Sequence, residues 1–257
     1  MNFNAVYFSP TGNTEKTIKA IEEGIGEKFK NYNITLKKNR DEKIKFTKND
    51  LVILGCPVYV GRIPNIEDDL FKNIKGDNTP CVLVVNYGNR EYEDALIELK
   101  NVALNKGFIP IAAGAFIGEH SYSREIATNR PDENDLKEIT EFGKKIKNKI
   151  NKELDLKKDL VVSGNYPYRD VPNSPKIAPS ANEVCTECGK CIGVCPVDAI
   201  DKNNPKQTDA NKCIKCFACV KICPVNAKDI NAIPFKEKVE SIKKICLSRK
   251  KEIEVFI

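Results

Sequence analysis

The 257-residue sequence lacks three features that would place it in other classes of protein. No stretch approaches the roughly 18–20 consecutive apolar residues that a membrane-spanning helix needs. The first residues, Met1–Asn4, show no basic segment followed by an apolar one, so no signal peptide is indicated and a cytoplasmic location is expected. No G-x-G-x-x-G follows an expected strand, so nothing supports a nicotinamide site.

Cysteine, in contrast, is abundant, with eleven in the chain. Eight of them fall into two tight groups with identical spacing, and this pattern without an export signal favours metal binding over disulfides. The others, Cys56, Cys81 and Cys246, are expected to be buried and to act as small apolar side chains.

The two cysteine groups form an internal repeat that begins at Cys185 and again at Cys213. Each copy reads C-x2-C-x2-C-x3-C-P, in which three closely spaced cysteines wrap a tight loop around one iron–sulfur cubane. Pro196 and Pro224 fix φ and turn the chain after the fourth cysteine. Structural zinc, the alternative, usually takes two close pairs divided by a longer spacer, and the short spacings here favour iron–sulfur clusters.

Over Glu183–Ile230 the repeat resembles the bacterial two-cluster ferredoxins at every ligand position. The resemblance implies two [4Fe–4S] clusters with crossed ligation, in which the fourth cysteine of each copy binds the other cluster. The first cluster would be bound by Cys185, Cys188, Cys191 and Cys223. The second would be bound by Cys213, Cys216, Cys219 and Cys195. Clusters held entirely by cysteine have no open iron position, which implies electron transfer at low potential rather than substrate activation.

The residues before the repeat alternate between short apolar runs and helical patterns. Five strands are expected, at Phe3–Phe8, Ile34–Leu36, Leu51–Cys56, Cys81–Tyr87 and Phe108–Ala115. Helices are expected at Thr14–Phe29, Tyr92–Lys106 and Asp132–Asn151. This alternation predicts an α/β fold with a doubly wound, five-stranded parallel sheet in the flavodoxin-like order 2-1-3-4-5, followed by a small α+β ferredoxin-like domain.

A polar loop, Ser9-Pro10-Thr11-Gly12-Asn13-Thr14, follows the first expected strand and opens the first helix. Its hydroxyls and the free amides of a helix start would form an anion cradle; a capped turn, with Thr11 or Asn13 as N-cap, is the alternative. Open α/β sheets bind ligands at this edge, and the pattern resembles the FMN-phosphate loop of flavodoxins. The resemblance implies that FMN phosphate is bound by Ser9, Thr11, Gly12, Asn13 and Thr14.

Two further segments are expected at the same edge, where flavodoxins place the loops on either side of the isoalloxazine ring. The resemblance implies ring contacts from Pro57, Val58, Tyr59, Val60, Gly61, Asn86, Tyr87, Gly88 and Asn89. Tyr59 or Tyr87 would stack on the ring, with an exposed turn position as the alternative. Acidic residues typical of these loops in flavodoxins are missing here.

Three more side chains follow expected strands at this edge. His120, the only histidine, has a simple interpretation as a packed or surface residue and a functional one as a proton relay or domain contact. Arg62 and Arg90 are candidates to neutralise a reduced flavin, or are solvated surface groups.

Composition predicts four segments along the chain. Residues 1–162 form the FMN-binding domain and residues 183–230 the two-cluster domain. Between them, residues 163–182 form a semi-rigid linker that is rich in proline, at Pro167, Pro172, Pro175 and Pro179. Residues 231–257 form a tail with a helix at 235–249 that packs back on one of the domains.

As a whole, residues 1–230 resemble a fused flavodoxin–ferredoxin family of electron carriers. The resemblance implies a carrier that holds FMN and two [4Fe–4S] clusters and serves redox partner proteins. A flavin-dependent reductase of a small molecule, fed by the clusters, is the alternative, and a flavin-free docking domain is a third hypothesis. The formal charge of +6 does not indicate nucleic acid as a partner, because clusters and phosphate add negative charge and the lysines are dispersed among acids.

Overall fold

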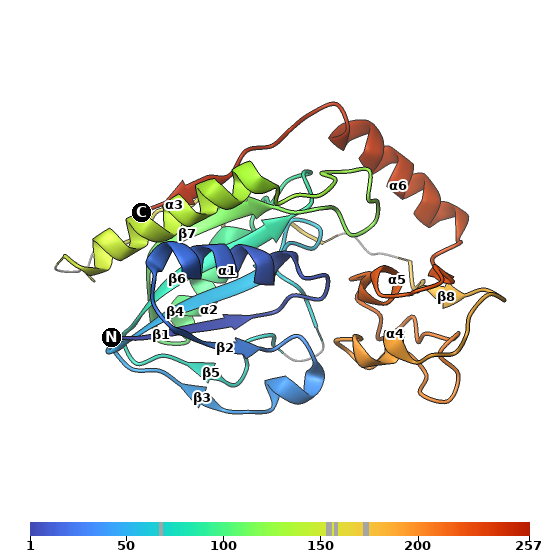
Figure 1. The fold of residues 1–257 in the computed structure, drawn as a ribbon, viewed down its shortest axis with the longest axis horizontal. Coiled ribbons are helices and arrows are strands. Elements are labelled where there is room, and N and C mark those ends of the chain that lie inside the picture. The colour runs from blue at the N-terminus through green and yellow to red at the C-terminus, as the bar shows by residue number, and fades with distance from the viewer. Residues whose placement is uncertain (67–68, 153–155, 157–158, 172–174) are drawn as a thin grey trace.

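A computed structural model describes residues 1–66, 69–152, 156, 159–171 and 175–257. It shows a layered α/β domain, a small cysteine-rich unit, and a C-terminal segment that returns from this unit to the α/β domain (Figure 1). Within those residues, no helix is both long enough and apolar enough to cross a bilayer.

The central sheet has six strands in the order β10-β7-β6-β4-β1-β2. The five parallel strands are β1 (Asn2–Tyr7), β2 (Phe29–Asn33), β4 (Asp50–Pro57), β6 (Thr79–Tyr87) and β7 (Phe108–Ile117). Their order is the one predicted from the sequence. The sixth strand, β10 (Glu254–Phe256), lies antiparallel on β7 and was not predicted. It adds an edge strand from the C-terminal segment to an otherwise parallel sheet.

Helices cover both faces of the sheet (Figure 1). The helices α1 (Asn13–Ile25) and α3 (Glu133–Ile150) lie together on one face, and α2 (Ala95–Asn105) lies on the other. The short strands β3 (Ile44–Lys45) and β5 (Ile74–Lys75) pair beside the sheet, near a 3-10 turn at Lys37–Arg40.

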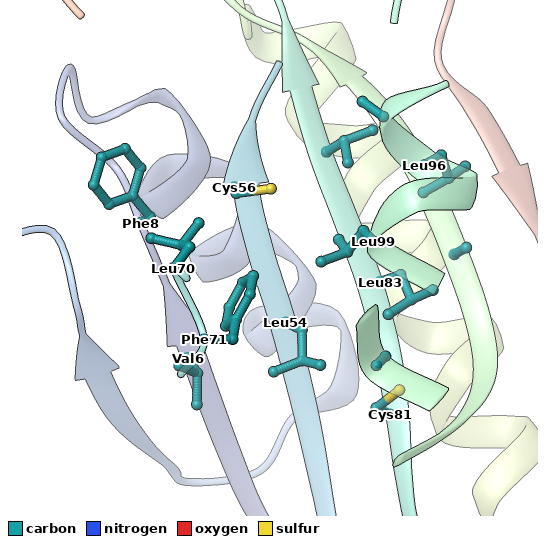
Figure 2. Packing of buried hydrophobic residues seen from close by; sticks show 14 of the residues in the cluster. Val6, Phe8, Leu54, Cys56, Leu70, Phe71, Cys81, Leu83, Leu96 and Leu99 are labelled. Atoms are coloured by element: carbon teal, nitrogen blue, oxygen red, sulfur yellow. The ribbon is translucent and has the colours of Figure 1, made fainter. Parts of the chain in front are cut away.

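Two apolar layers hold these elements together because successive strand residues point to opposite faces. On the α2 face, Leu54 and Leu83 of the central strands pack with Leu96 and Leu99 of the helix (Figure 2). The other layer packs the sheet against α1 and α3 and includes Ile18, Ile21, Ile139 and Phe142. Each fully buried side chain of this size stabilises the fold by about 1.5–3 kcal/mol.

The second strand was predicted at the wrong place, since Ile34–Leu36 was expected and β2 ends at Asn33. The cause is an early end to α1 at Gly26, which adopts φ +71° and donates its amide to the carbonyl of Glu22. The chain therefore enters the sheet sooner than the apolar pattern indicated. Ile34 is buried just beyond the strand, which explains its apolar signal.

The three cysteines outside the repeat are buried, as predicted. Cys56 and Cys81 lie on β4 and β6 within the core layer that faces α2 (Figure 2). Cys246 is buried at the end of α6 (Ile233–Cys246).

The cysteine-rich unit contains two one-turn helices, α4 (Lys190–Gly193) and α5 (Ala218–Lys221), one in each copy of the repeat. An antiparallel pair closes the unit, formed by β8 (Ser180–Ala181) and β9 (Lys228–Asp229). This pairing begins slightly before the predicted domain boundary at residue 183.

The linker runs along the N-terminal end of α2 and is held there by the buried carboxylate of Asp94. That carboxylate accepts hydrogen bonds from the backbone amides of Asn165 at 2.8 Å and Arg169 at 2.7 Å. Arg62 lies over the ring of Tyr168, 4.5 Å from its centre. Residues 172–174, including Pro172 of the predicted linker, lie outside the described residues.

The C-terminal segment is a helix followed by a strand, whereas only the helix was predicted. The helix α6 leads away from the cysteine-rich unit, and the chain then returns to the sheet edge as β10 (Figure 1). We call residues 247–257 the C-terminal strap. Tyr87 donates its hydroxyl to the carbonyl of Glu252 at 3.3 Å, and Arg130 donates to the carbonyl of Lys251 at 2.8 Å.

Candidate functional site

One cavity of about 390 Å³ brings together the loops that the sequence singled out. It lies beyond the carboxyl ends of β1, β4 and β6, where open α/β sheets bind ligands. Its volume is within the range of about 300–1,000 Å³ that ligand pockets occupy. Among its lining residues are twelve of the predicted FMN contacts: Ser9, Thr11, Asn13, Thr14, Pro57, Val58, Tyr59, Val60, Gly61, Asn86, Tyr87 and Gly88.

The loop before α1 places the helix start at the cavity. Gly12, at φ +89°, is the N-cap, so neither Thr11 nor Asn13 holds that position, and Oγ of Ser9 accepts a hydrogen bond from the first-turn amide of Glu15 at 3.0 Å. Asn13 instead donates its side-chain amide to the carbonyl of Glu119 at 2.9 Å. The capped-turn alternative is therefore wrong. The positive end of the α1 dipole, with Thr14 buried beside it, faces the cavity and suits an anion.

The loop after β4 makes a tight turn. The backbones of Tyr59 and Arg62 bond to each other in both directions, at 2.9 and 3.1 Å. Val60 and Gly61 between them have φ of +54° and +81°, as a two-residue turn of this kind requires. The turn places Tyr59 in the cavity wall, and burial raises the pKa of its hydroxyl well above the usual value.

The loop after β6 places Tyr87, but not Asn89, in the cavity wall. Tyr87 lines the cavity, but its ring packs 5.5 Å from that of Tyr92 within the core. Tyr59 is therefore the better placed of the two tyrosines for stacking on a ring. Asn89 does not line the cavity, and its side chain bonds to the C-terminal segment instead.

His120 lies in the cavity wall against Gly88, where a Cβ would come within 2.6 Å of the imidazole. Desolvation, together with the positive charge of Arg90, lowers the pKa of His120 to about 4. The imidazole is therefore neutral at neutral pH. Its Nδ1 accepts a hydrogen bond from the backbone amide of Tyr122 at 3.1 Å, which leaves the proton on Nε2.

The two candidate arginines are both paired with acids. Arg62 forms two hydrogen bonds to Glu98, at 2.7 and 2.8 Å, and lies outside this cavity. Arg90 lines the cavity and is paired with Glu93 at 2.8 Å. Of the two, only Arg90 is placed near a bound flavin.

Several lining residues were not predicted as FMN contacts. They come from the loop after β7 and from the C-terminal half of the chain, and include Glu119, Tyr122, Cys216, Lys238 and Ile242. Cys216 is a predicted cluster ligand, and Lys238 and Ile242 belong to α6. Cys216, Lys238 and Ile242 reach the cavity because the cysteine-rich unit and α6 pack on the sheet domain, and no local sequence pattern predicts this packing.

The predicted ligands of the first cluster lie around one small hollow. It is lined by Cys185, Cys188, Cys191 and Cys223, so the fourth cysteine of the second copy faces three cysteines of the first. This placement suits the crossed ligation, which remains a prediction.

The predicted ligands of the second cluster are more deeply buried. Burial raises the pKa of the Cys216 thiol, and the nearby thiols of Cys219, Cys195 and Cys213 raise it further. Burial also raises the pKa of Cys219 to about 12. The irons of a cubane would supply the positive charge that stabilises buried cysteines such as Cys216 and Cys219 as thiolates.

Backbone amides point at the sulfurs at equivalent places in the two copies. The amide of Ala199 donates to Sγ of Cys195, and that of Ala227 donates to Sγ of Cys223, both at 3.2 Å. Such bonds stabilise thiolates and tune cluster potentials. Among the described residues, no three His, Cys, Asp or Glu side chains converge on a position for a single metal ion. A cubane instead spreads its ligands over four irons.

Comparisons with known proteins show two partial similarities. Residues 179–224 match the family model of the 4Fe-4S dicluster domain. A flavodoxin from Clostridium saccharobutylicum is 24% identical over 156 residues, which span 58% of this chain and 98% of that protein. One part of the chain is thus similar to a 4Fe-4S dicluster domain and another part to a flavodoxin.

Two solved structures share the flavodoxin-like part. A flavodoxin from the domain Archaea is 17% identical, with a TM-score of 0.40, over 59% of this chain and all of that one. A Fusobacterium nucleatum flavodoxin bound to flavin mononucleotide is also 17% identical, with a TM-score of 0.37, over 57% of this chain and 97% of that one.

The flavodoxin-like and dicluster domains contact each other directly through polar groups. Arg40 donates to the carbonyl of Pro196 at 2.7 Å, and Lys221 donates to the carbonyl of Thr11 at 3.2 Å. Pro196 directly follows a predicted ligand, and Lys221 lies between two others. The Lys221–Thr11 bond thus joins the second cysteine copy to the loop that faces the FMN cavity.

Proposed function

We propose that this protein is an electron carrier that holds FMN in the 390 Å³ cavity and two [4Fe–4S] clusters in the dicluster domain. The observation that carries the proposal is the meeting of three loops, from the ends of β1, β4 and β6, in one cavity that also includes the start of α1. Bound FMN exchanges one or two electrons and each cluster exchanges one. A protein that holds both kinds of cofactor therefore connects one-electron and two-electron partners.

Different residues of the cavity would bind the phosphate and the ring of FMN. The start of α1, with Ser9, Thr11 and Thr14, would hold the phosphate, and Tyr59 would pack on the ring. Arg90 would offset negative charge on the reduced ring. Neutral His120 would offer its Nε2 proton as a hydrogen-bond donor while leaving the charge of the site unchanged.

A reductase of small molecules needs convergent polar groups above the flavin. Arg62 is bonded to Glu98 outside the cavity. Tyr122 is packed among aromatic rings, and desolvation keeps its pKa high, at about 12. The geometry therefore favours a carrier.

The test is a comparison of acceptors, using protein isolated without oxygen and chemically reduced. A carrier passes electrons to one-electron acceptor proteins such as cytochrome c and gives unsaturable, unselective rates with quinones and nitroaromatics. Saturable turnover of one small molecule that is abolished in His120→Ala would favour the reductase. Failure to bind FMN after reconstitution would leave the flavodoxin-like domain as a docking module and refute the flavin half of the proposal.

A further inference from the structure

The two cluster sites are not equivalent with respect to the FMN cavity. Of the eight predicted ligands, all of which the structure describes, Cys216 alone lines the cavity. Cys213, three residues earlier, lines an adjoining hollow together with Tyr59 and Tyr122, which both also line the cavity. The second cysteine copy therefore meets the flavin side of the molecule.

The first cysteine copy faces away from that cavity. Every residue around its hollow belongs to the dicluster domain, from Ala181 to Lys228. Cys188 is exposed, and its partners Cys185, Cys191 and Cys223 are partly exposed, whereas Cys216 is buried. Exposed apolar side chains lie beside this set, with Val184 at 58% and Val225 at 39% of their full exposure. A protein partner can approach here without passing the flavodoxin-like domain.

An aromatic contact joins the second copy to the loop after β7. Phe217 directly follows Cys216, and its ring lies 4.9 Å from that of Tyr122, which lines the FMN cavity. Phe235 of α6 stacks on Phe217 at 5.5 Å and contacts Tyr122 at 5.1 Å. Packed aromatic rings therefore connect the loop that contains Cys216 to the wall of the FMN cavity.

The internal repeat shows that this contact is specific to the second copy. Phe217 has φ +64°, and the equivalent residue of the first copy is Gly189, with φ +72°. Glycine adopts this conformation freely, whereas a residue with a Cβ is strained by about 1–2 kcal/mol. The second copy therefore accepts backbone strain to place an aromatic ring against Tyr122, and such strain is characteristic of functional positions.

We infer that electrons move through the molecule in a fixed order, in which the first cluster faces external partners and the second cluster faces the flavin. In the reducing direction, a one-electron donor protein is oxidised by one electron and the first cluster is reduced. That electron passes to the second cluster and then to the flavin. Two such transfers, with protons taken from solvent, reduce the flavin fully; the oxidising direction reverses the order. This inference rests on the proposed FMN and cluster sites.

The repeat also supplies matched variants, Cys188→Ala and Cys216→Ala, which change equivalent ligands in the two copies. Each is expected to retain about four irons per chain. In full-length, FMN-loaded protein, a laser flash with deazaflavin would inject one electron, and its redistribution between cluster and flavin would be followed by absorbance. We expect Cys216→Ala to lose the fast redistribution phase and Cys188→Ala to keep it.

Steady emission from bound FMN gives a second readout that needs no electron transfer. A nearby cluster quenches flavin emission, so emission per bound FMN should rise in Cys216→Ala and stay at the wild-type level in Cys188→Ala. The opposite pattern, or equal behaviour of the two variants, would overturn the inferred order. A protein that binds no FMN in titration would instead refute the proposed function itself.

Phe217→Gly tests the same inference without removing a cluster ligand, in case the cysteine variants do not fold. It retains all eight cysteines and copies the residue found in the first copy, so about eight irons and unchanged FMN affinity are expected. We expect slower redistribution in this variant, with the aromatic contact gone. A wild-type rate would show that Phe217 and Tyr122 do not couple the sites.

Discussion

Asn89 and Lys251 are bonded side chain to backbone, with the amide of Lys251 donating to Oδ1 of Asn89 at 2.9 Å. The Nδ2 group of the same side chain donates to the carbonyls of Cys246 at 3.0 Å and Arg249 at 2.9 Å. Asn89 is 3% exposed. One buried side chain therefore satisfies three backbone groups where α6 passes into the C-terminal strap, and it fixes the helix that closes one side of the FMN cavity.

Replacing Asn89 with Ala should destabilise the protein and release the strap. The change leaves buried backbone groups without partners, which costs about 1–3 kcal/mol each when water cannot replace the lost bond. Asn78→Ala is the control, because Asn78 has positive φ, at +51°, as Asn89 does at +58°, but is exposed and within the described residues bonds through its side chain to its neighbour Asp77. Urea unfolding and limited proteolysis after residue 246 would show a larger effect for Asn89→Ala. Equal effects would mean that the loss arises from backbone strain alone.

Replacing Thr14 with Ala should weaken FMN binding. A hydrogen bond to a charged group contributes about 1.5–3 kcal/mol, so its loss would raise the Kd roughly 10- to 150-fold. Thr140→Ala is a suitable control, since that hydroxyl lies on α3, away from the cavity, and donates to the carbonyl of Leu136 in its own helix. Fluorescence titration measures both constants. An unchanged Kd in Thr14→Ala would argue against the phosphate loop.

His120 should make the protein less stable as the pH falls. Its folded pKa, about 4, lies below the ordinary value of 6.5 because of burial and Arg90, so the unfolded chain binds the proton first. Stability contributed by the neutral imidazole is present above pH 6.5 and is lost as the pH falls toward 4. In His120→Asn this part of the slope should disappear, as measured by urea unfolding between about pH 7.5 and 5.5, where clusters survive. If the free energy of unfolding of His120→Asn still fell with pH as in the wild type, the pH dependence would come from other groups.

Replacing Cys195 with Ala should damage the second cluster, although Cys195 belongs to the first copy of the motif. Cys223→Ala is the matched variant and should damage the first cluster. Crossed ligation is the reason, because each fourth cysteine turns toward the partner loop. EPR of the two reduced variants would resolve the remaining signals, with Cys188→Ala and Cys216→Ala as references. If Cys195→Ala lost the first cluster, or Cys223→Ala lost the second, the crossed assignment would be refuted.

The sequence predicted those features that depend on local pattern. The strand order follows from the alternation of elements, and the two C-x2-C-x2-C-x3-C-P runs are visible from spacing within a few residues. The start of α1 could be placed because Gly12 and the polar residues around it are adjacent in the chain. The early end of α1 at Gly26 was missed because a helical apolar pattern continues past it.

Features that depend on distant segments could not be predicted. The strand β10 is three residues long, and its partner Gly114 on β7 is far away in the sequence. Asn89 looked like a ring contact because of its loop, but its side chain is used by the strap. Likewise, Cys216 carries the same local signal as Cys188, and only the packing of the two domains places one of them in the cavity wall.

The most direct test of the whole account is the quantification of iron, sulfide and flavin in full-length protein isolated without oxygen and reconstituted with FMN. The account predicts about eight irons and eight sulfides per chain, from two cubanes, together with one FMN. Zinc in place of iron, or about four irons per chain, would contradict the paired clusters. A full complement of iron with no bound FMN would contradict the flavin site.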